Sequence, residues 1–177
     1  MAETTIIVTA YNIESYIEEC LDSVAAQTLT DIEVLVVDDG SSDTTQAKIV
    51  EFCDADPRFV PVLLGENSPG GVATAANAGL DRATARWVGF VDGDDYVEPT
   101  MFEQLVSGAA GCDADLAMCE YQEVVDGSGE RRDPADAHRW AELTASCYKL
   151  DIQTRRQVLR FIAVPWRKLY RLSLIHI

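Results

Sequence analysis

The first hundred residues alternate between short apolar runs and longer segments in which apolar residues recur at helical spacing. Four runs rich in β-branched residues are expected to form strands, at residues 5–9, 32–37, 59–64 and 87–91. Helical spacing occupies the intervals after them, at residues 13–27, 43–52, 72–83 and 99–107. This alternation predicts an α/β fold with a mostly parallel sheet and helices on both of its faces.

Polar residues follow three of the expected strands at the point where each strand ends. These segments are Thr9-Ala10-Tyr11-Asn12, Asp38-Asp39-Gly40 and Asp92-Gly93-Asp94-Asp95. In open α/β sheets, ligands bind outside the carboxyl ends of the strands. Because parallel strands end at the same edge, the three segments are expected to lie on one rim and to form a site.

The pattern weakens after Ala114. Residues 114–125 are expected to be extended, 126–129 to form a turn and 130–139 a charged loop. Asp151 is placed to cap a helix that reaches about residue 161, and the segment PWRKLY follows at 165–170.

Asp92, Asp94 and Asp95 repel one another, so their placement after a buried strand needs an explanation. Hard carboxylate oxygens at this spacing can share one Mg²⁺ or Mn²⁺, which keeps positions open for substrate phosphates. Neither His nor Cys lies nearby, which argues against a zinc site. The alternative is an ordinary acidic turn, but a second acidic strand end opposite favours the metal.

Asp38 and Asp39 have two possible roles. They can cap the following helix within a tight turn, since Asp and Ser are good cap residues. A carboxylate here can instead accept a hydrogen bond from a nucleobase N–H while Tyr11 stacks on the ring. For Tyr11, the alternative is a place in the core.

Charge narrows the choice of partners. The chain has 30 Asp and Glu against 14 Lys and Arg, a net charge of −16. Nucleic-acid binding is not expected, because it depends on the neutralisation of phosphates by cationic side chains. The six bases after Lys149 are accompanied by one acid, Asp151. This basic end is expected either to contact phospholipid head groups or an acidic part of a larger protein, or to form an exposed basic helix face.

The five cysteines are scattered and form no C-x-x-C pair, so we expect small core residues in a reducing compartment. The chain opens without a signal-peptide pattern, and no apolar run reaches the roughly 18 residues that span a bilayer. We expect a cytoplasmic protein, at the inner face of the membrane if the basic end binds lipid. The sequence has no Walker A loop, G-x-G-x-x-G fingerprint, serine nucleophile elbow or Cys/His pair.

Three segments together resemble the family 2 glycosyltransferases of the GT-A, Rossmann-like fold. They are TIIVTAYNIESYIEECLDSVAAQT, IEVLVVDDGSSDTT and NAGLDRATARWVGFVDGDDYVEPTMFEQL, and they cover residues 4–105 in the order and spacing of the family. PWRKLYRLSLI resembles a further segment of bacterial members that build surface polysaccharides.

The resemblance implies a role for each site residue. Thr9, Tyr11 and Asp39, with Asp38 beside them, match positions that hold the nucleotide base. Asp92 and Asp94 match the D-x-D pair that holds the sugar diphosphate through a divalent metal, Mn²⁺ or Mg²⁺; Asp94 is the more direct ligand and Asp95 would assist or substitute. The reaction implied is transfer of a sugar from a nucleotide-sugar, a UDP-sugar by expectation, to a hydroxyl of a glycan or lipid-linked acceptor, with inversion.

Two departures from the family matter. Ala75-Ala76-Asn77 stands where relatives often read A-R-N, so one basic residue is missing near the phosphates. The general base of an inverting transferase lies in the family downstream of the K-L-Y-R stretch, and is expected beyond Ile177. We therefore expect a fragment of one GT-A domain, with residues 1–110 as the donor-binding region and 111–177 as the start of the acceptor side.

Two other functions are compatible with the residues. A sugar nucleotidyltransferase also combines an α/β sheet with a metal, but usually has a Gly-rich basic loop after its first strand, where this chain has Tyr11-Asn12-Ile13-Glu14. A non-catalytic module that binds nucleotide-sugars is the third possibility, and a turnover assay on the full-length protein would separate it from a transferase.

Overall fold

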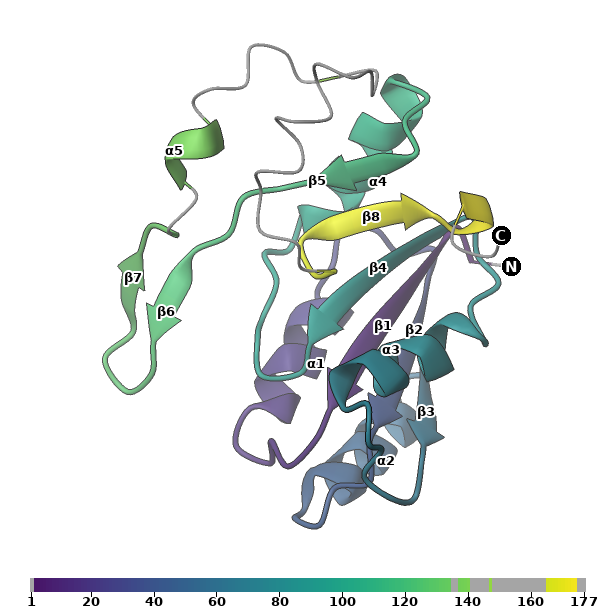
Figure 1. Ribbon diagram of the computed structural model, residues 1–177, viewed down its shortest axis with the longest axis vertical. Coiled ribbons are helices and arrows are strands. Elements are labelled where there is room, and N and C mark those ends of the chain that lie inside the picture. Colours follow the sequence, from purple (N-terminus) through teal and green to yellow (C-terminus); the bar gives the residue numbers. More distant parts are fainter. Residues whose placement is uncertain (1, 135–136, 141–146, 148–164, 175–177) are drawn as a thin grey trace.

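The computed structural model of the chain describes residues 2–134, 137–140, 147 and 165–174. Within them, six strands form one central sheet in the order β3-β2-β1-β4-β8-β5 (Figure 1). The strands are β1 (Thr4–Ala10), β2 (Ile32–Asp38), β3 (Phe59–Leu63), β4 (Trp87–Asp92), β5 (Leu116–Met118) and β8 (Lys168–Arg171). The four strands β3, β2, β1 and β4 are parallel, whereas β8 is antiparallel to both of its neighbours. The predicted mostly parallel α/β fold is confirmed.

Helices cover both faces of the sheet. One face is covered by α1 (Ile17–Ala25), α2 (Thr45–Ala55) and α4 (Met101–Gly111). Their apolar side chains pack against the residues of β1 and β2 that point to this face, among them Ile6, Val8, Val34 and Val36. On the other face, α3 (Val72–Leu80) packs over Ile7, Leu35 and Val37 (Figure 1). Because β1 and β2 are covered on both faces, their side chains are almost all buried, which explains their nearly continuous apolar sequence.

The second half of the chain adds to the same sheet. Strand β8 pairs with β4 and β5, and Leu169 belongs to the core that α1, α2 and α4 cover. The described parts of regions 1–110 and 111–177 therefore share one core. A short 3₁₀ helix, η1 (Leu172–Leu174), follows β8.

A separate two-stranded hairpin, β6 (Glu123–Val125) and β7 (Glu130–Arg132), lies beside the main sheet (Figure 1). The expectation of a charged loop over 130–139 is wrong, because this segment contains β7 and the short helix α5 (Ala137–Trp140). The three residues of β7 are polar and exposed, and the strand exists through its pairing with β6. The helix expected over 151–161 lies outside the described residues.

Cysteines and basic residues differ in part from expectation. Cys20 and Cys53 are buried as predicted, but Cys112 and Cys147 are exposed, so the prediction of core cysteines is wrong for these two. None of the described helices has the length and apolar character needed to cross a bilayer. At the basic end, Arg171 is paired with Asp113 and Asp115 at 2.9 and 3.0 Å; this arginine is therefore used within the fold.

Candidate functional site

The three polar strand ends meet at one edge of the sheet. Residue pairing places Ala10 beside Asp38 and Thr9 beside Asp92, so β1, β2 and β4 end at the same level. The arrowheads of the three strands point to this edge in Figure 1. We call the edge, with the loops 10–16, 38–44, 64–71 and 92–98 that follow the strands, the rim.

The acidic segment after β4 is a tight turn attached to β1. The amide of Gly93 donates to the carbonyl of Thr9 at 2.9 Å, and the amide of Asp95 donates to the carbonyl of Asp92 at 2.9 Å. The hydroxyl of Thr9 also donates to Oδ1 of Asp92 at 3.4 Å. Thr9 is buried and Asp92 half-buried, whereas Asp94 and Asp95 are exposed. The Thr9 side chain thus points to Asp92 and not to solvent.

Burial and neighbouring carboxylates raise the pKa values of Asp92 and Asp95 in this turn. Desolvation by the surrounding protein, reinforced by the charges of Asp94 and Asp92, raises the pKa of Asp95 to about 6. Desolvation and the charge of Asp94 also raise the pKa of Asp92, against the lowering effect of the Thr9 hydrogen bond. A raised carboxyl pKa means that the ionised form is disfavoured in the fold. A cation at this turn would remove that penalty.

Asp92, Asp94 and Asp95 fit a metal site that leaves coordination positions free for a ligand, and not one that the protein fills completely. Among the described residues, no three His, Cys, Asp or Glu side chains are grouped as a ready-made metal cage. Mg²⁺ and chemically similar ions are commonly held by one or two carboxylates together with substrate phosphates. Asp94 and Asp92 supply that donor type at the rim, with Asp95 next to them.

Asp39 connects the end of β2 to the loop 64–71. Its side chain is only 3% exposed, and Ser68 donates to both carboxylate oxygens, through its amide at 3.1 Å and its hydroxyl at 3.0 Å. Gly40 permits this approach: its φ is +76°, and a Cβ there would lie 2.4 Å from the carbonyl carbon of Glu66. Asp39 therefore does not cap α2, and that alternative is wrong.

Asp38 and Tyr11 have different surroundings. Asp38 is fully buried, and its carboxylate accepts hydrogen bonds from the amide of Ser41 at 3.1 Å and from the hydroxyl of the same residue. This geometry fits the tight turn. Tyr11 is 45% exposed, so the alternative of a core tyrosine is wrong and the ring is available at the rim.

Sequence reasoning missed the contacts that bring the hairpin to the rim. The hydroxyl of Tyr16 donates to Oδ2 of Asp126 at 2.9 Å, and Arg131 pairs with Glu98 at 3.5 Å. The Asp126 bond raises the pKa of Tyr16, and the charge of Asp94 adds to this effect. The hairpin tip therefore lies near the acidic turn. An exposed tyrosine at a helix start was the available signal, but its partner is 110 residues away.

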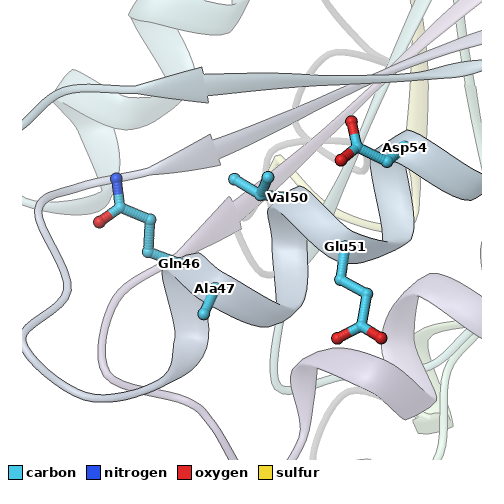
Figure 2. A pocket seen from close by; sticks show the side chains of 5 residues that line it. All are labelled: Gln46, Ala47, Val50, Glu51 and Asp54. Carbon is cyan, nitrogen blue, oxygen red and sulfur yellow. The ribbon is translucent and has the colours of Figure 1, made fainter.

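A hollow lies away from the rim, along α2 (Figure 2). It is lined by Gln46, Ala47, Val50, Glu51 and Asp54. These side chains come from one helix and bring no strand end or aromatic ring together. The rim is the better candidate site.

Comparison with known proteins gives the same family from sequence and structure. The model of Glycosyl transferase family 2 matches residues 5–176. "Uncharacterized glycosyltransferase EpsJ" of Bacillus subtilis (strain 168) is 34% identical over 171 residues, which are 96% of this chain and 48% of the relative.

Solved structures show the same likeness. S. aureus TarS 1-349 in complex with UDP has a TM-score of 0.77 and 30% identity, covering 98% of this chain and 48% of that one. The complex of the same protein with UDP-GlcNAc has the same TM-score and identity. The mannosyltransferase PcManGT from Pyrobaculum calidifontis, in complex with GDP-Man and Mn²⁺, has a TM-score of 0.59 and 28% identity over 67% of this chain and 36% of its own. This chain thus spans about half the length of EpsJ and TarS 1-349.

Proposed function

This chain belongs to glycosyltransferase family 2, and from that premise we propose that it forms the donor-binding half of a metal-assisted transferase of UDP-sugars. The observation that carries the proposal is the rim itself, where an exposed Tyr11 and a buried, hydrogen-bonded Asp39 lie on one side and the acids of β4 on the other. The UDP and UDP-GlcNAc held by the TarS structures support a uridine nucleotide. Membership of this family leaves no support for the sugar nucleotidyltransferase alternative.

Each side of the rim has a distinct task in this proposal. Tyr11 stacks on the base, and the Asp39 carboxylate accepts the hydrogen bond of a base N–H. Thr9 keeps Asp92 oriented, and Asp92, Asp94 and Asp95 hold a divalent cation, Mn²⁺ or Mg²⁺, against the diphosphate. When bound, the cation neutralises charge on the departing nucleoside diphosphate.

The acceptor side is part of the same proposal. We propose that the acceptor is a hydroxyl of a glycan or a lipid-linked glycan in cell-surface polysaccharide synthesis, and that the sugar is transferred with inversion. The cytoplasm, at the inner face of the membrane, is the proposed location, where UDP-sugars and a lipid-linked acceptor would meet. The general base is assigned to no residue of this chain.

Isothermal titration calorimetry with UDP tests the proposal. We expect binding that is strengthened by Mn²⁺ or Mg²⁺, with a Kd at or below the millimolar range, about −4 kcal/mol or better. CDP is the matched control, because cytosine has no N–H where uracil has its N3–H. Absence of metal-dependent UDP binding at millimolar ligand would contradict the proposal.

The base side can be tested separately through Asp39. Asp39→Ala removes the base contact but no cation ligand, so UDP affinity should fall both with and without metal. A lost charge-assisted hydrogen bond corresponds to roughly 1.5–3 kcal/mol. Calorimetry with UDP measures this loss, and Mn²⁺-dependent binding of pyrophosphate, which lacks a base, should persist. Unchanged UDP affinity in a folded variant would leave Asp39 with only its contact to Ser68.

A further inference from the structure

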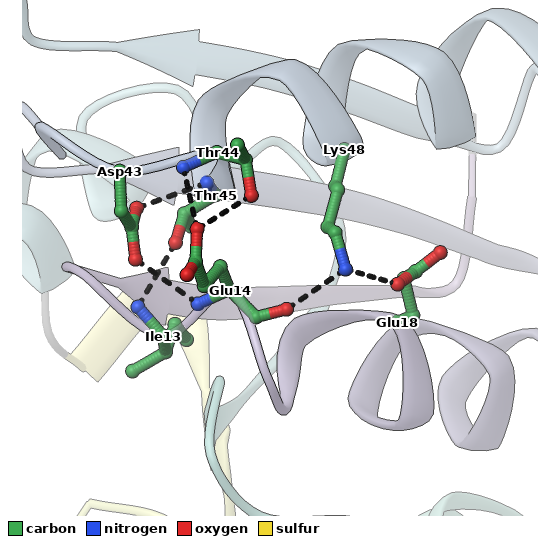
Figure 3. A network of polar contacts seen from close by, with 7 residues as sticks. All are labelled: Ile13, Glu14, Glu18, Asp43, Thr44, Thr45 and Lys48. Atoms are coloured by element: carbon green, nitrogen blue, oxygen red, sulfur yellow. Dashed lines mark hydrogen bonds and ion pairs between the residues drawn. The ribbon is translucent and has the colours of Figure 1, made fainter.

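Loop 11–16, which carries Tyr11, is fastened to loop 41–45 by a row of hydrogen bonds. Three consecutive amides donate across the gap to side-chain oxygens. Asn12 donates to Oγ of Ser41 at 2.9 Å, Ile13 to Oγ1 of Thr45 at 2.9 Å, and Glu14 to Oδ2 of Asp43 at 3.2 Å. The last two of these contacts are drawn in Figure 3. The helix predicted over 13–27 is shorter than expected, because α1 spans only Ile17–Ala25 and residues 12–14 form a loop that bonds to loop 41–45.

Glu14 reaches back in the opposite direction (Figure 3). Its Oε2 accepts hydrogen bonds from both the amide and the hydroxyl of Thr44, at 3.0 and 2.6 Å. Thr44 precedes the first residue of α2 and makes no capping bond with its own side chain. Glu14 therefore supplies, from another loop, an acceptor that the start of a helix normally obtains locally.

The two halves of the proposed base site lie on or next to these loops. Tyr11 directly precedes the fastened residues, and Asp39 lies inside the turn that Asp38 and Ser41 form. Ser41 links the two sides, because its hydroxyl donates to Asp38 while its oxygen accepts from the amide of Asn12. The distance between the Tyr11 ring and the Asp39 carboxylate is thus governed by the contacts between the loops.

We propose that Glu14 is a positioning residue for the nucleobase half of the site, acting by holding loop 11–16 against the start of α2. The inference rests on the proposed function, because it assigns the base to the space between Tyr11 and Asp39. Both Thr44 donors use the same oxygen of Glu14, so a glutamine can accept both with its amide oxygen. An alanine can accept neither, and an aspartate is one methylene too short.

Calorimetry on four proteins, the wild type, Glu14→Ala, Glu14→Gln and Glu18→Gln, tests the proposal with two probes, UDP and inorganic pyrophosphate, each with Mn²⁺. Glu14→Ala should weaken UDP binding about tenfold, as expected for the loss of one to two hydrogen bonds that hold the loop. Glu14→Gln should stay within about threefold of the wild type, since it retains the acceptor oxygen. Glu18→Gln is the matched control: it removes one charge from the ion pair with Lys48 on α2 and leaves both bonds from Thr44 to Glu14 in place (Figure 3).

Pyrophosphate separates positioning from general damage, because it lacks the base and uses only the acidic side of the rim. Its affinity should be unchanged in all variants. Thr44→Val removes the hydroxyl, one of the two donors, so UDP affinity should fall less than in Glu14→Ala. This variant tests the same contact if Glu14→Ala does not fold. Equal UDP affinity in Glu14→Ala and wild type, or a parallel loss for UDP and pyrophosphate, would overturn the positioning role alone. A wild type that binds pyrophosphate but not UDP would overturn the proposed base site, and the positioning role with it.

Discussion

Asp94→Asn removes one charge from the acidic turn and leaves the size of the side chain unchanged. The charge of Asp94 contributes to the raised pKa values of Asp92 and Asp95. Its removal should therefore leave the metal-free protein equally stable or slightly more stable, while the binding of Mn²⁺ with UDP is lost. Thermal melts with and without these ligands measure both effects. A ligand at a hundredfold excess over its Kd adds roughly 2.7 kcal/mol to the wild type, and this shift should vanish in the variant.

The acidic-turn alternative predicts the reverse pair of results. If the three acids serve only the turn, Asp94→Asn should melt earlier and keep the full ligand shift. Asp22→Asn is a suitable control, since Asp22 is an exposed acid on α1. Its variant should keep the ligand shift in either case.

Gly93 fixes the shape of the turn through lack of space. A Cβ at this position would lie 2.7 Å from the carbonyl oxygen of Thr9 and 2.6 Å from Cδ1 of Ile13. The backbone contact cannot be relieved by a rotamer change, so Gly93→Ala should cost about 1–3 kcal/mol of unfolding free energy. Chemical denaturation measures this loss.

Gly108 provides the matched control for that substitution. It lies within α4, where a Cβ would meet no other atom within 4 Å. Gly108→Ala should therefore stabilise the protein by about 0.5–1 kcal/mol, because alanine loses less entropy in a helix. Equal effects of the two substitutions would contradict the packing argument for Gly93.

At the level of elements, the sequence predicts best where burial is greatest. The runs expected at 5–9 and 32–37 correspond to β1 (Thr4–Ala10) and β2 (Ile32–Asp38), because strands covered on both faces need apolar residues at nearly every position. Convergence of the strand ends followed from parallel topology alone. What could not be predicted depends on partners distant in the sequence: the bond from Ser68 to Asp39 and the polar strand β7.

The hairpin is joined to the rim by the hydrogen bond from Tyr16 to Asp126 and the ion pair of Arg131 with Glu98. Tyr16→Phe removes only the hydroxyl that donates to Asp126. We expect faster amide hydrogen exchange in residues 123–132 of this variant, with little change in β1 or β4, because both partners are exposed and the core does not depend on them. Exchange measured by mass spectrometry reports this directly.

A double-variant comparison identifies the contact responsible. Asp126→Asn should speed exchange in the same residues, and combining it with Tyr16→Phe should add little, since both remove one hydrogen bond. Additive effects, or unchanged exchange in either single variant, would show that the Tyr16–Asp126 bond does not hold the hairpin at the rim.

At the scale of the whole molecule, the net charge of −16 should repel an anionic nucleotide. Two described cations near the rim, Lys48 of α2 and Arg131 of β7, are already paired with Glu18 and Glu98. UDP should therefore meet a repulsive potential when no divalent metal is present. Raising NaCl from about 20 to about 200 mM shortens the Debye length from roughly 20 to 7 Å. Metal-free UDP binding should then strengthen about two- to fivefold, because screening weakens the repulsion.

Uridine is the control for this effect, since it presents the same base without charge. Its affinity should stay constant over the same range of salt, measured by calorimetry at fixed pH in the presence of EDTA. The opposite trend for UDP, weaker binding as salt rises, would show that cationic side chains dominate the potential at the rim. That result would contradict the repulsion argued here. If the affinities of uridine and UDP change with salt in parallel, neither repulsion by acids nor attraction by cationic side chains governs UDP binding. The salt effect would then arise from binding of the base.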